Sequence, residues 1–340
     1  MGTKRTKSRA RTQNELAQGY RYGDSDDAVD DTDEHLTTRG KQAQKDKTAN
    51  TAAMRAAEPA DIADMQSLPI GRVTQVHSLF CDVEYAGKTF RCVIRKTLAK
   101  TSQTQLVVGD AVRFRDTGTI ESVIEQILPR RTVLTRSDSF KQLVQHPIVA
   151  NADQMLIVVS VKSPAVKWGL VDRMLVAARS GGLEPIICLN KIDLLEQTTA
   201  DVSAALDYYA TLGTRTLRTS AERADGLDAL REILKDKVTV LAGPSGAGKS
   251  RLIGSIQPGL DIRVGQVSEF TAKGRHTTTS ARHYPLSFGG AMIDTPGVKV
   301  FGLWGVKREN LIDFFPDISA DSAPPWRAES YQRIADSLAP

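Results

Sequence analysis

The stretch GPSGAGKS, residues 243–250, has the residue types and spacing of a loop that wraps phosphate groups. An apolar run, KVTVLAG at 237–243, precedes it and a helical pattern follows it, which is the context that such a loop requires. Its glycines let backbone N–H groups close around phosphates at the N-terminus of the next helix. We expect Lys249 to reach the β- and γ-phosphates and Ser250 to bind Mg²⁺. The predicted phosphate-binding residues are Gly243, Pro244, Ser245, Gly246, Ala247, Gly248, Lys249 and Ser250.

This loop alone indicates a nucleotide but not which one. GPSGAGKS also resembles the phosphate loop of guanylate kinases, so a guanylate-type kinase is an alternative function. The base must be read by other residues.

Two further stretches have the chemistry to read guanine. NKID, residues 190–193, follows the buried run PIICLN, and ligands of open α/β sheets bind at such strand ends. The Asp193 carboxylate can accept both N1–H and N2–H of guanine, while the Lys191 stem can lie along the purine and Asn190 can brace the neighbouring loop. Thr219, Ser220 and Ala221 end the next predicted strand and offer a backbone donor to guanine O6. A simple helix-capping turn is the alternative there.

The γ-phosphate and the metal are expected to contact two later stretches. In DTPG, residues 294–297, Asp294 can hold a water of the Mg²⁺ shell and the Gly297 N–H can meet the γ-phosphate; a plain Pro-Gly turn is the alternative. GRHTTT, at 274–279, brings several hydroxyls into a Gly-bounded segment. Either Thr277 or Thr278 can reach Mg²⁺, and the sequence does not choose between them.

The order of these motifs is unusual. NKID and TSA precede the phosphate loop, whereas a guanine-nucleotide protein of ordinary layout has them after it. If the chain began at Val238, the ordinary order would return. Each motif would still stand at the C-terminal end of its strand, so the same site could form. The sequence therefore predicts a circularly permuted GTPase domain.

Alternating strands and helices must position these motifs. The apolar runs at 154–161 and 185–190, and those at 214–218, 237–243 and 291–297, read as strands of one doubly wound, mostly parallel sheet. Helices are predicted at 169–182, 200–212 and 226–234, and another directly after the phosphate loop. We predict that the GTPase domain spans 138–303.

A smaller all-β domain is predicted at 66–137. Five short runs, GRVTQV, LFCDVEY, KTFRCVI, DAVRFRD and TIESVIEQIL, alternate in polarity, which favours an oligonucleotide-binding (OB) barrel, with an SH3-like barrel as the alternative. Twelve Lys and Arg against seven Asp and Glu between Gln66 and Lys141 leave an excess of five, equal to the formal charge of the whole chain. Such a basic block favours RNA. The predicted RNA-binding residues are Arg91, Arg95, Lys96, Arg113 and Arg115.

The rest of the chain carries few signals. Residues 1–65 are charged and poor in apolar periodicity, which predicts a disordered tail with a short helix near Ala52–Met65. No apolar run approaches the ~18 residues of a membrane span. Cys81, Cys92 and Cys188 have no metal-ligand spacing and predict buried thiols in a reducing cytoplasm.

Together, the permuted motifs and the preceding basic segment resemble the ribosome small-subunit-dependent GTPase A family. The resemblance covers roughly residues 68–340 and includes GRV at 71–73, VVGD at 107–110, LPRRTVLTR at 128–136 and DTPGV at 294–298. It implies an OB domain, a permuted GTPase domain and a C-terminal zinc domain. It also implies binding to the 30S subunit and its 16S rRNA late in assembly, with hydrolysis of GTP to GDP and phosphate on that subunit. We expect a monomer.

Two departures qualify these expectations. Val298 follows DTPG where Ras has its water-orienting Gln, so His276 is the nearest polar candidate, and the resemblance supports it as a catalytic residue beside Lys249, Thr277 and Thr278. In addition, no Cys follows Cys188 and no His follows His283. The family's zinc cluster is therefore missing, zinc is not expected, and 304–340 is predicted to be a reduced helical segment.

The sequence thus favours a GTPase of 30S maturation that uses GTP and Mg²⁺. The alternatives are the guanylate-type kinase and an RNA-binding module that holds GTP without hydrolysing it.

Overall fold

The structure is a computed structural model that describes residues 62–95, 105–136, 146–198, 201–260, 281–295, 301–303 and 305–338. Several predictions fall outside these residues and are not described by it. They concern the tail up to residue 61, Lys96, the GRHTTT stretch with His276, Thr277 and Thr278, and Gly297.

A closed five-stranded barrel follows the short helix α2 (Ile62–Ser67). Its strands are β1 (Ile70–Val76), β2 (Cys81–Tyr85), β3 (Lys88–Ile94), β4 (Ala111–Arg115) and β5 (Ser122–Ile127). The strand order is β1-β2-β3-β5-β4, and β4 pairs back onto β1 to close the barrel. Only the β3–β5 pairing is parallel, which requires a crossing connection rather than a simple meander. The predicted OB-type barrel is confirmed.

Alternation along the strands fills the barrel interior. Val73, Val83, Cys92, Phe114 and Ile124 are all buried in one apolar cluster. Cys81 and Cys92 stand directly opposite each other on β2 and β3, and both remain free thiols. Burial raises the pKa of the Cys92 thiol to about 12, so it stays protonated and packs as a small apolar side chain.

The GTPase domain is built on a six-stranded sheet with the order β10-β9-β8-β11-β13-β12. All neighbours are parallel except β12, which runs antiparallel to β13. The strands are β8 (Gln154–Ser160), β9 (Glu184–Asn190), β10 (Arg215–Arg218), β11 (Val238–Ala242), β12 (Arg282–Pro285) and β13 (Ala291–Asp294). A separate antiparallel pair, β6 (Val133–Arg136) and β7 (His146–Ala150), precedes this sheet.

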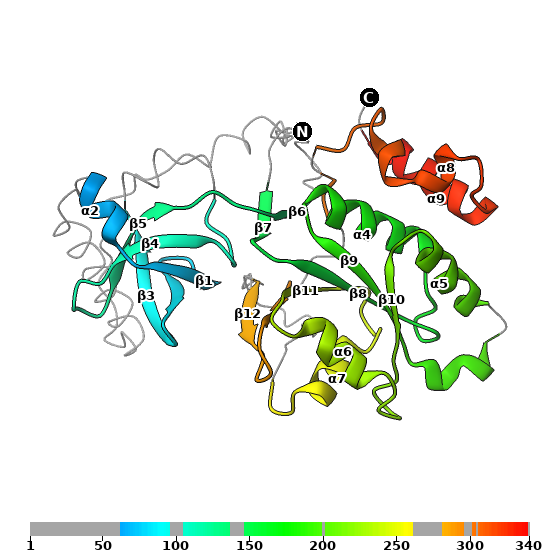
Figure 1. Cartoon of the computed structure of the whole chain (residues 1–340), viewed down its shortest axis with the longest axis horizontal. Coiled ribbons are helices and arrows are strands. Elements are labelled where there is room, and N and C mark those ends of the chain that lie inside the picture. The colour runs from blue at the N-terminus through cyan, green and yellow to red at the C-terminus, as the bar shows by residue number, and fades with distance from the viewer. Residues whose placement is uncertain are drawn as a thin grey trace, which may run out of the picture. The chain divides into compact units, whose positions relative to one another are not determined.

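Helices cover both faces of the sheet. Figure 1 shows α4 (Trp168–Ser180) and α5 (Val202–Thr211) on one side, and α6 (Leu227–Leu234) and α7 (Lys249–Ile256) on the other. Successive side chains of β8 pack on opposite faces of the sheet, because side chains alternate across a strand. Met155 and Ile157 pack in the cluster that includes α4 and α5, whereas Leu156 packs in the cluster that includes α6 and α7. The doubly wound sheet is as predicted.

Strand β12 was not predicted from the sequence. It is four residues long and ends in Pro285, so its local pattern is weak. Pairing with β13 makes it a strand, and a single register pair, Gln75 with Arg282, also links it to β1 of the barrel. Pairing with its neighbour β13 in a short hairpin therefore decided this element, rather than local propensity.

The C-terminal segment contains the short helices η2 (Leu311–Phe314) and α8 (Pro316–Ser319) and the longer α9 (Pro325–Ser337). Arg327 of α9 is 2% exposed, and its Nε donates to Asp317 Oδ2 at 2.8 Å. The same guanidinium pairs with Asp172 of α4 and lies 4.2 Å from the centre of the Phe315 ring. A buried ion network therefore attaches the C-terminal helix to the GTPase domain.

Two searches concern the described residues only. None of their helices has the length and apolar character to cross a membrane. They also contain no group of three or more His, Cys, Asp or Glu side chains arranged to hold a metal ion.

Candidate nucleotide-binding site

The predicted phosphate loop lies between the end of β11 and the start of α7. Gly243, Gly246 and Gly248 all have positive φ angles, of 128°, 81° and 90°. A Cβ at Gly243 would collide with the Val158 carbonyl oxygen, and one at Gly248 would lie 2.5 Å from the Asn190 side-chain nitrogen. Only glycine allows this backbone to approach its neighbours so closely.

Lys249 lies folded over this loop. It is 8% exposed, and its Nζ donates to the carbonyl oxygens of Gly243 and Pro244, both at 2.8 Å. Burial lowers the pKa of Lys249, while the charge of Asp294 partly opposes that change. Ser250, the next residue, is exposed. The ammonium and the hydroxyl predicted to contact phosphate and Mg²⁺ therefore stand together at the first turn of α7.

Asp294 ends β13, the strand beside β11, and pairs in register with Leu241. Its carboxylate is nearly buried, and burial raises its pKa although the charge of Lys249 lowers it. Lys249, at the start of α7, and Asp294, at the end of β13, therefore influence each other electrostatically, which is the arrangement expected for a phosphate-binding lysine near a metal-site carboxylate.

The NKID stretch lies directly beside the phosphate loop. Asn190 ends β9, and its Nδ2 donates to the Ala247 carbonyl oxygen at 2.9 Å. Thr219 Oγ1 in turn donates to Asn190 Oδ1 at 3.2 Å. These two contacts join the NKID stretch (the base loop), the phosphate loop and the TSA stretch, which are far apart along the chain. The bracing role predicted for Asn190 is consistent with this geometry.

Asp193 lies in the 3₁₀-helix η1 (Ile192–Gln197) that follows. Its Oδ1 accepts a hydrogen bond from Ser220 Oγ at 2.5 Å, and Ser220 Oγ itself accepts from the Arg223 backbone N–H at 3.1 Å. Ser220 was predicted through its backbone, so the side-chain link to Asp193 is an addition from the structure. Ala221, the last residue of that prediction, is half-buried next to it.

Three of the four described arginines predicted to bind RNA have partners in the barrel or in the segment just before it. Arg95 pairs with Glu125 at 2.7 Å, and Arg115 pairs with Glu125 and with Asp64. Arg113 Nη1 donates to two backbone carbonyl oxygens, at Gln66 and Leu68. Arg91 is exposed and lies 4.3 Å from the centre of the Phe80 ring. Arg91 is therefore the member of the predicted set whose side chain is most available to an RNA phosphate. RNA binding by these residues remains a prediction.

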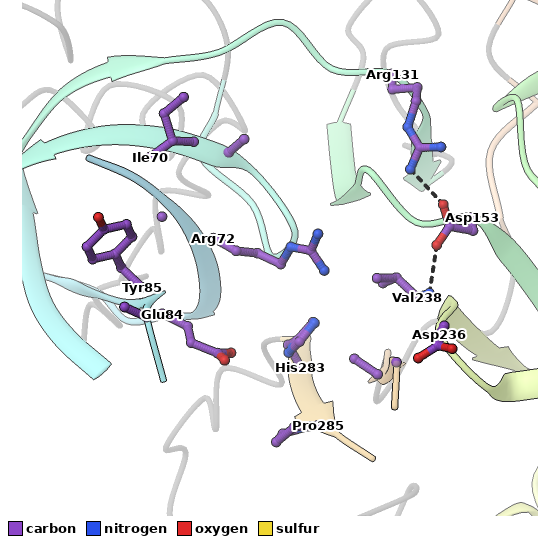
Figure 2. A pocket seen from close by; sticks show the side chains of 15 residues that line it. Ile70, Arg72, Glu84, Tyr85, Arg131, Asp153, Asp236, Val238, His283 and Pro285 are labelled. Carbon is purple, nitrogen blue, oxygen red and sulfur yellow. Dashed lines mark hydrogen bonds and ion pairs between the residues drawn. The ribbon is translucent and has the colours of Figure 1, made fainter. Parts of the chain in front are cut away.

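A cavity of about 570 Å³ lies at the other end of the sheet (Figure 2). Val238, the first residue of β11, lines it, and the opposite end of β11 leads into the phosphate loop. Arg72 and Glu84 are among its lining residues, and Asp153 accepts from Arg131 Nη2 and from the Val238 backbone N–H, both at 2.7 Å. Because charges of both signs line this cavity, it does not have the character of a phosphate site.

His283 of β12 lines the same cavity and was not predicted from the sequence. It is 7% exposed, and neither ring nitrogen has a hydrogen-bond partner among the described residues. Burial, together with the charge of Arg72, lowers its pKa to about 4. The imidazole is therefore neutral near pH 7.

Comparison with known proteins identifies this arrangement. Residues 127–304 match the family model described as RsgA GTPase. A small ribosomal subunit biogenesis GTPase RsgA from Ectopseudomonas mendocina is 39% identical over 276 residues, which cover 80% of this chain and 78% of the relative. A protein of the same name from Pseudomonas aeruginosa is 37% identical over 285 residues, covering 82% of each chain.

Solved structures agree on the fold. The crystal structure of YjeQ from Thermotoga maritima matches with a TM-score of 0.61 and 27% identity, covering 79% of this chain and 98% of that one. YloQ, described as a circularly permuted GTPase, matches with a TM-score of 0.60 and 23% identity over 82% of this chain and 98% of its own. The permuted order predicted from the motifs is therefore found in solved structures.

Proposed function

Because this chain belongs to the RsgA GTPase family, we propose that it acts in the biogenesis of the small ribosomal subunit and hydrolyses GTP to GDP and phosphate when bound to that subunit. The names of its relatives support the partner. The observation that carries the nucleotide assignment is the contact of Asn190 with Ala247, which brings the base loop against the phosphate loop.

Guanine is the base that this site suits. Ser220 donates to Oδ1 of the Asp193 carboxylate and not to its second oxygen. A carboxylate accepts the paired N1–H and N2–H donors of guanine. A site built on such donors and acceptors rejects an analogue that lacks them, since a buried polar group is then left unpaired. Adenine does not present this donor pair.

Mg²⁺ would be held by Ser250 directly and by Asp294 through water, with Thr277 or Thr278 as a further ligand. The metal would supply charge neutralisation of the β- and γ-phosphates. Lys249 would leave the carbonyl oxygens of its own loop for the phosphates, and Gly297 would donate its N–H to the γ-phosphate. His276 is proposed to position the attacking water, in place of the Gln that Val298 replaces.

We further propose that the barrel contacts 16S rRNA through its basic residues, that the protein works as a cytoplasmic monomer, and that it carries no zinc. The domain limits proposed are 66–137 for the barrel, 138–303 for the GTPase domain and 304–340 for the C-terminal segment.

The test is single-turnover hydrolysis of GTP by the full chain, alone, with 30S subunits and with 50S subunits. We expect slow hydrolysis alone, acceleration of at least ~10-fold by 30S subunits, and none by 50S subunits, because partner binding orders the catalytic segments. His276→Ala should bind GTP and 30S subunits normally but lose ~10²-fold or more of the stimulated rate. No hydrolysis under any condition would indicate a GTP-holding RNA module, and GMP-dependent ATP consumption would indicate a kinase.

A further inference from the structure

The loop at residues 161–167 connects β8 to α4 and contacts both halves of the nucleotide site. Lys191 Nζ donates to the Ser163 carbonyl oxygen at 2.5 Å, so this loop holds the lysine that is predicted to lie along the purine. On the phosphate side, a Cβ added at Gly246 would lie 3.2 Å from Pro164 Cδ. One irregular segment therefore lies against the phosphate loop and the base loop together.

Val161 and Val166 pack this loop against the core on the α4 side of the sheet, and a small set of hydrogen bonds fixes the segment between them. Its residues belong to no helix or strand, and Ser163 adopts the left-handed region with φ of 52°, which strains a residue that carries a side chain. Ser160, the last residue of β8, is 1% exposed, and its Oγ donates to the Pro164 carbonyl oxygen at 2.7 Å. Val161 N–H donates to the Asn190 carbonyl oxygen at 3.1 Å. Ser160 thus ties the loop back to the sheet.

We propose that Ser160 is a positioning residue for the nucleotide: its hydroxyl holds the 161–167 loop so that Ser163 fixes Lys191 and Pro164 supports the phosphate loop at Gly246. The proposal deepens the proposed GTP site and rests on it. None of the sequence motifs includes Ser160 or this loop.

Loss of the hydroxyl would act on binding rather than on chemistry. Without it, the Pro164 carbonyl oxygen loses its buried donor and the strained Ser163 backbone relaxes, so Lys191 loses its fixed acceptor. GTP and GDP share the guanine and the two inner phosphates, so both should lose affinity by the same factor. The γ-phosphate contacts come from other segments, and the rate at saturating GTP should therefore change little.

The experiment compares Ser160→Ala with wild type in the full chain. The dissociation constants of GDP and GTP, measured with a fluorescent guanine nucleotide and by competition, should both rise roughly fivefold to tenfold, as expected for one lost hydrogen bond. In 30S-stimulated turnover, KM should rise by the same factor while kcat stays within about twofold. Ser160→Cys keeps a weak donor, so its dissociation constants should lie between those of wild type and Ser160→Ala.

A matched control separates positioning from simple loss of stability. Thr132 Oγ1 donates to the Ala152 carbonyl oxygen at 2.6 Å, a buried bond of the same kind close to the other end of β8. Thr132→Val should lower the urea midpoint to a similar extent and leave both dissociation constants unchanged.

Two results would overturn the proposal: binding of both nucleotides by Ser160→Ala within twofold of wild type, or an equal loss of affinity in Thr132→Val. Failure of the proposed function looks different. A wild-type chain that binds GDP tightly but gains no hydrolysis from 30S subunits would contradict the role in the ribosome, while the ratio of dissociation constants would still decide the role of Ser160.

Discussion

At the scale of single residues, the choice of base depends on one carboxylate and the hydroxyl beside it. Asp193 accepts from Ser220 Oγ at 2.5 Å, and this bond limits how the carboxylate can turn. A side chain fixed in this way reads a hydrogen-bond pattern more strictly than a free one, because misalignment leaves a polar group unpaired.

Asp193→Asn is expected to shift preference from GTP toward XTP. The amide would donate to the O2 acceptor of xanthine where the carboxylate accepted the N2–H of guanine, a change of ~1–3 kcal/mol or more. Competition between GTP and XTP for the fluorescent nucleotide measures it, with Asp207→Asn, an exposed residue paired with Arg218, as the control. A variant that still prefers GTP would show that NKID does not read the base.

Among the elements of the barrel, the described arginines of the predicted RNA-binding set divide into three that bond to neighbouring groups and Arg91, which is exposed. Glu125 is 1% exposed and accepts from Arg95 and Arg115, so these two cations stabilise a buried carboxylate. Arg91 is exposed over Phe80 and can contact a polyanion without giving up an ion pair within the barrel. Their substitution should therefore have different consequences.

Arg91→Glu is expected to weaken 30S association and to reduce the slope of log K against log salt by roughly one unit, the contribution of one phosphate contact. GTP affinity should not change, because the residue belongs to the barrel. Arg95→Glu, in contrast, places a second carboxylate beside buried Glu125 and should mainly destabilise the barrel. Sedimentation with 30S subunits at several salt concentrations and urea unfolding distinguish the two. Unchanged 30S affinity in Arg91→Glu would remove Arg91 from the proposed interface.

Strand β12 should confer a pH dependence on stability through His283. Its pKa is about 4 in the folded chain and ~6.5 when unfolded, so the unfolded chain binds the extra proton between these values. Stability is therefore lost as pH falls from ~6.5 toward 4, by about 2 kcal/mol at pH 5. Urea unfolding at pH 7 and pH 5 should show that His283→Gln lacks this part of the loss of stability. His77 is half-buried on the barrel, and His77→Gln should keep the loss. An equal fall in His283→Gln and wild type would contradict the assignment.

Across the whole molecule, a buried ion network attaches the C-terminal segment to α4. Asp172 and Asp317 have fully buried side chains and both pair with Arg327. Tyr209 OH donates to Asp172 Oδ1 at 2.5 Å and Tyr208 OH to Asp317 Oδ2 at 2.9 Å, while Asp172 Oδ2 has no hydrogen-bond partner among the described residues. Removing one partner from such a network strongly lowers the free energy of unfolding, because a buried charge is left uncompensated.

Arg327→Met should lower the free energy of unfolding by about 3–5 kcal/mol, because two buried carboxylates lose their cation. Arg333→Met provides the control, since Arg333 pairs with Glu329 on the exposed surface of the same helix and should cost less than ~1 kcal/mol. Urea unfolding measures both. Equal effects would show that the buried network does not hold α9 in place.

Metal removal is expected to leave the molecule intact. Dialysis against a chelator should not shift the melting temperature, and elemental analysis of the protein as purified should find far less than one zinc per chain. A structural zinc contributes folding free energy directly, so its removal would be visible as a large loss of stability. One bound zinc per chain would show that the C-terminal segment had been misread.

Features with local signals could be predicted from the amino-acid sequence. Glycines that must adopt positive φ mark the phosphate loop, and unbroken apolar runs such as QMLIVVSV mark strands covered on both faces. The order of the motifs was enough to predict the permutation, and alternation was enough to predict the five-stranded barrel. These properties need no knowledge of distant partners.

Features that depend on residues far apart in the chain emerged only from the folded structure. Arg327 meets Asp172 across 155 positions, Arg282 of β12 pairs with Gln75 of β1, and Arg95 meets Glu125 of β5. Ser160 acquires its proposed role only because its loop lies between two motifs that the chain brings together from residues 190 and 246. Periodicity and spacing report which face a residue occupies, whereas the partner it meets there is set by how the elements pack.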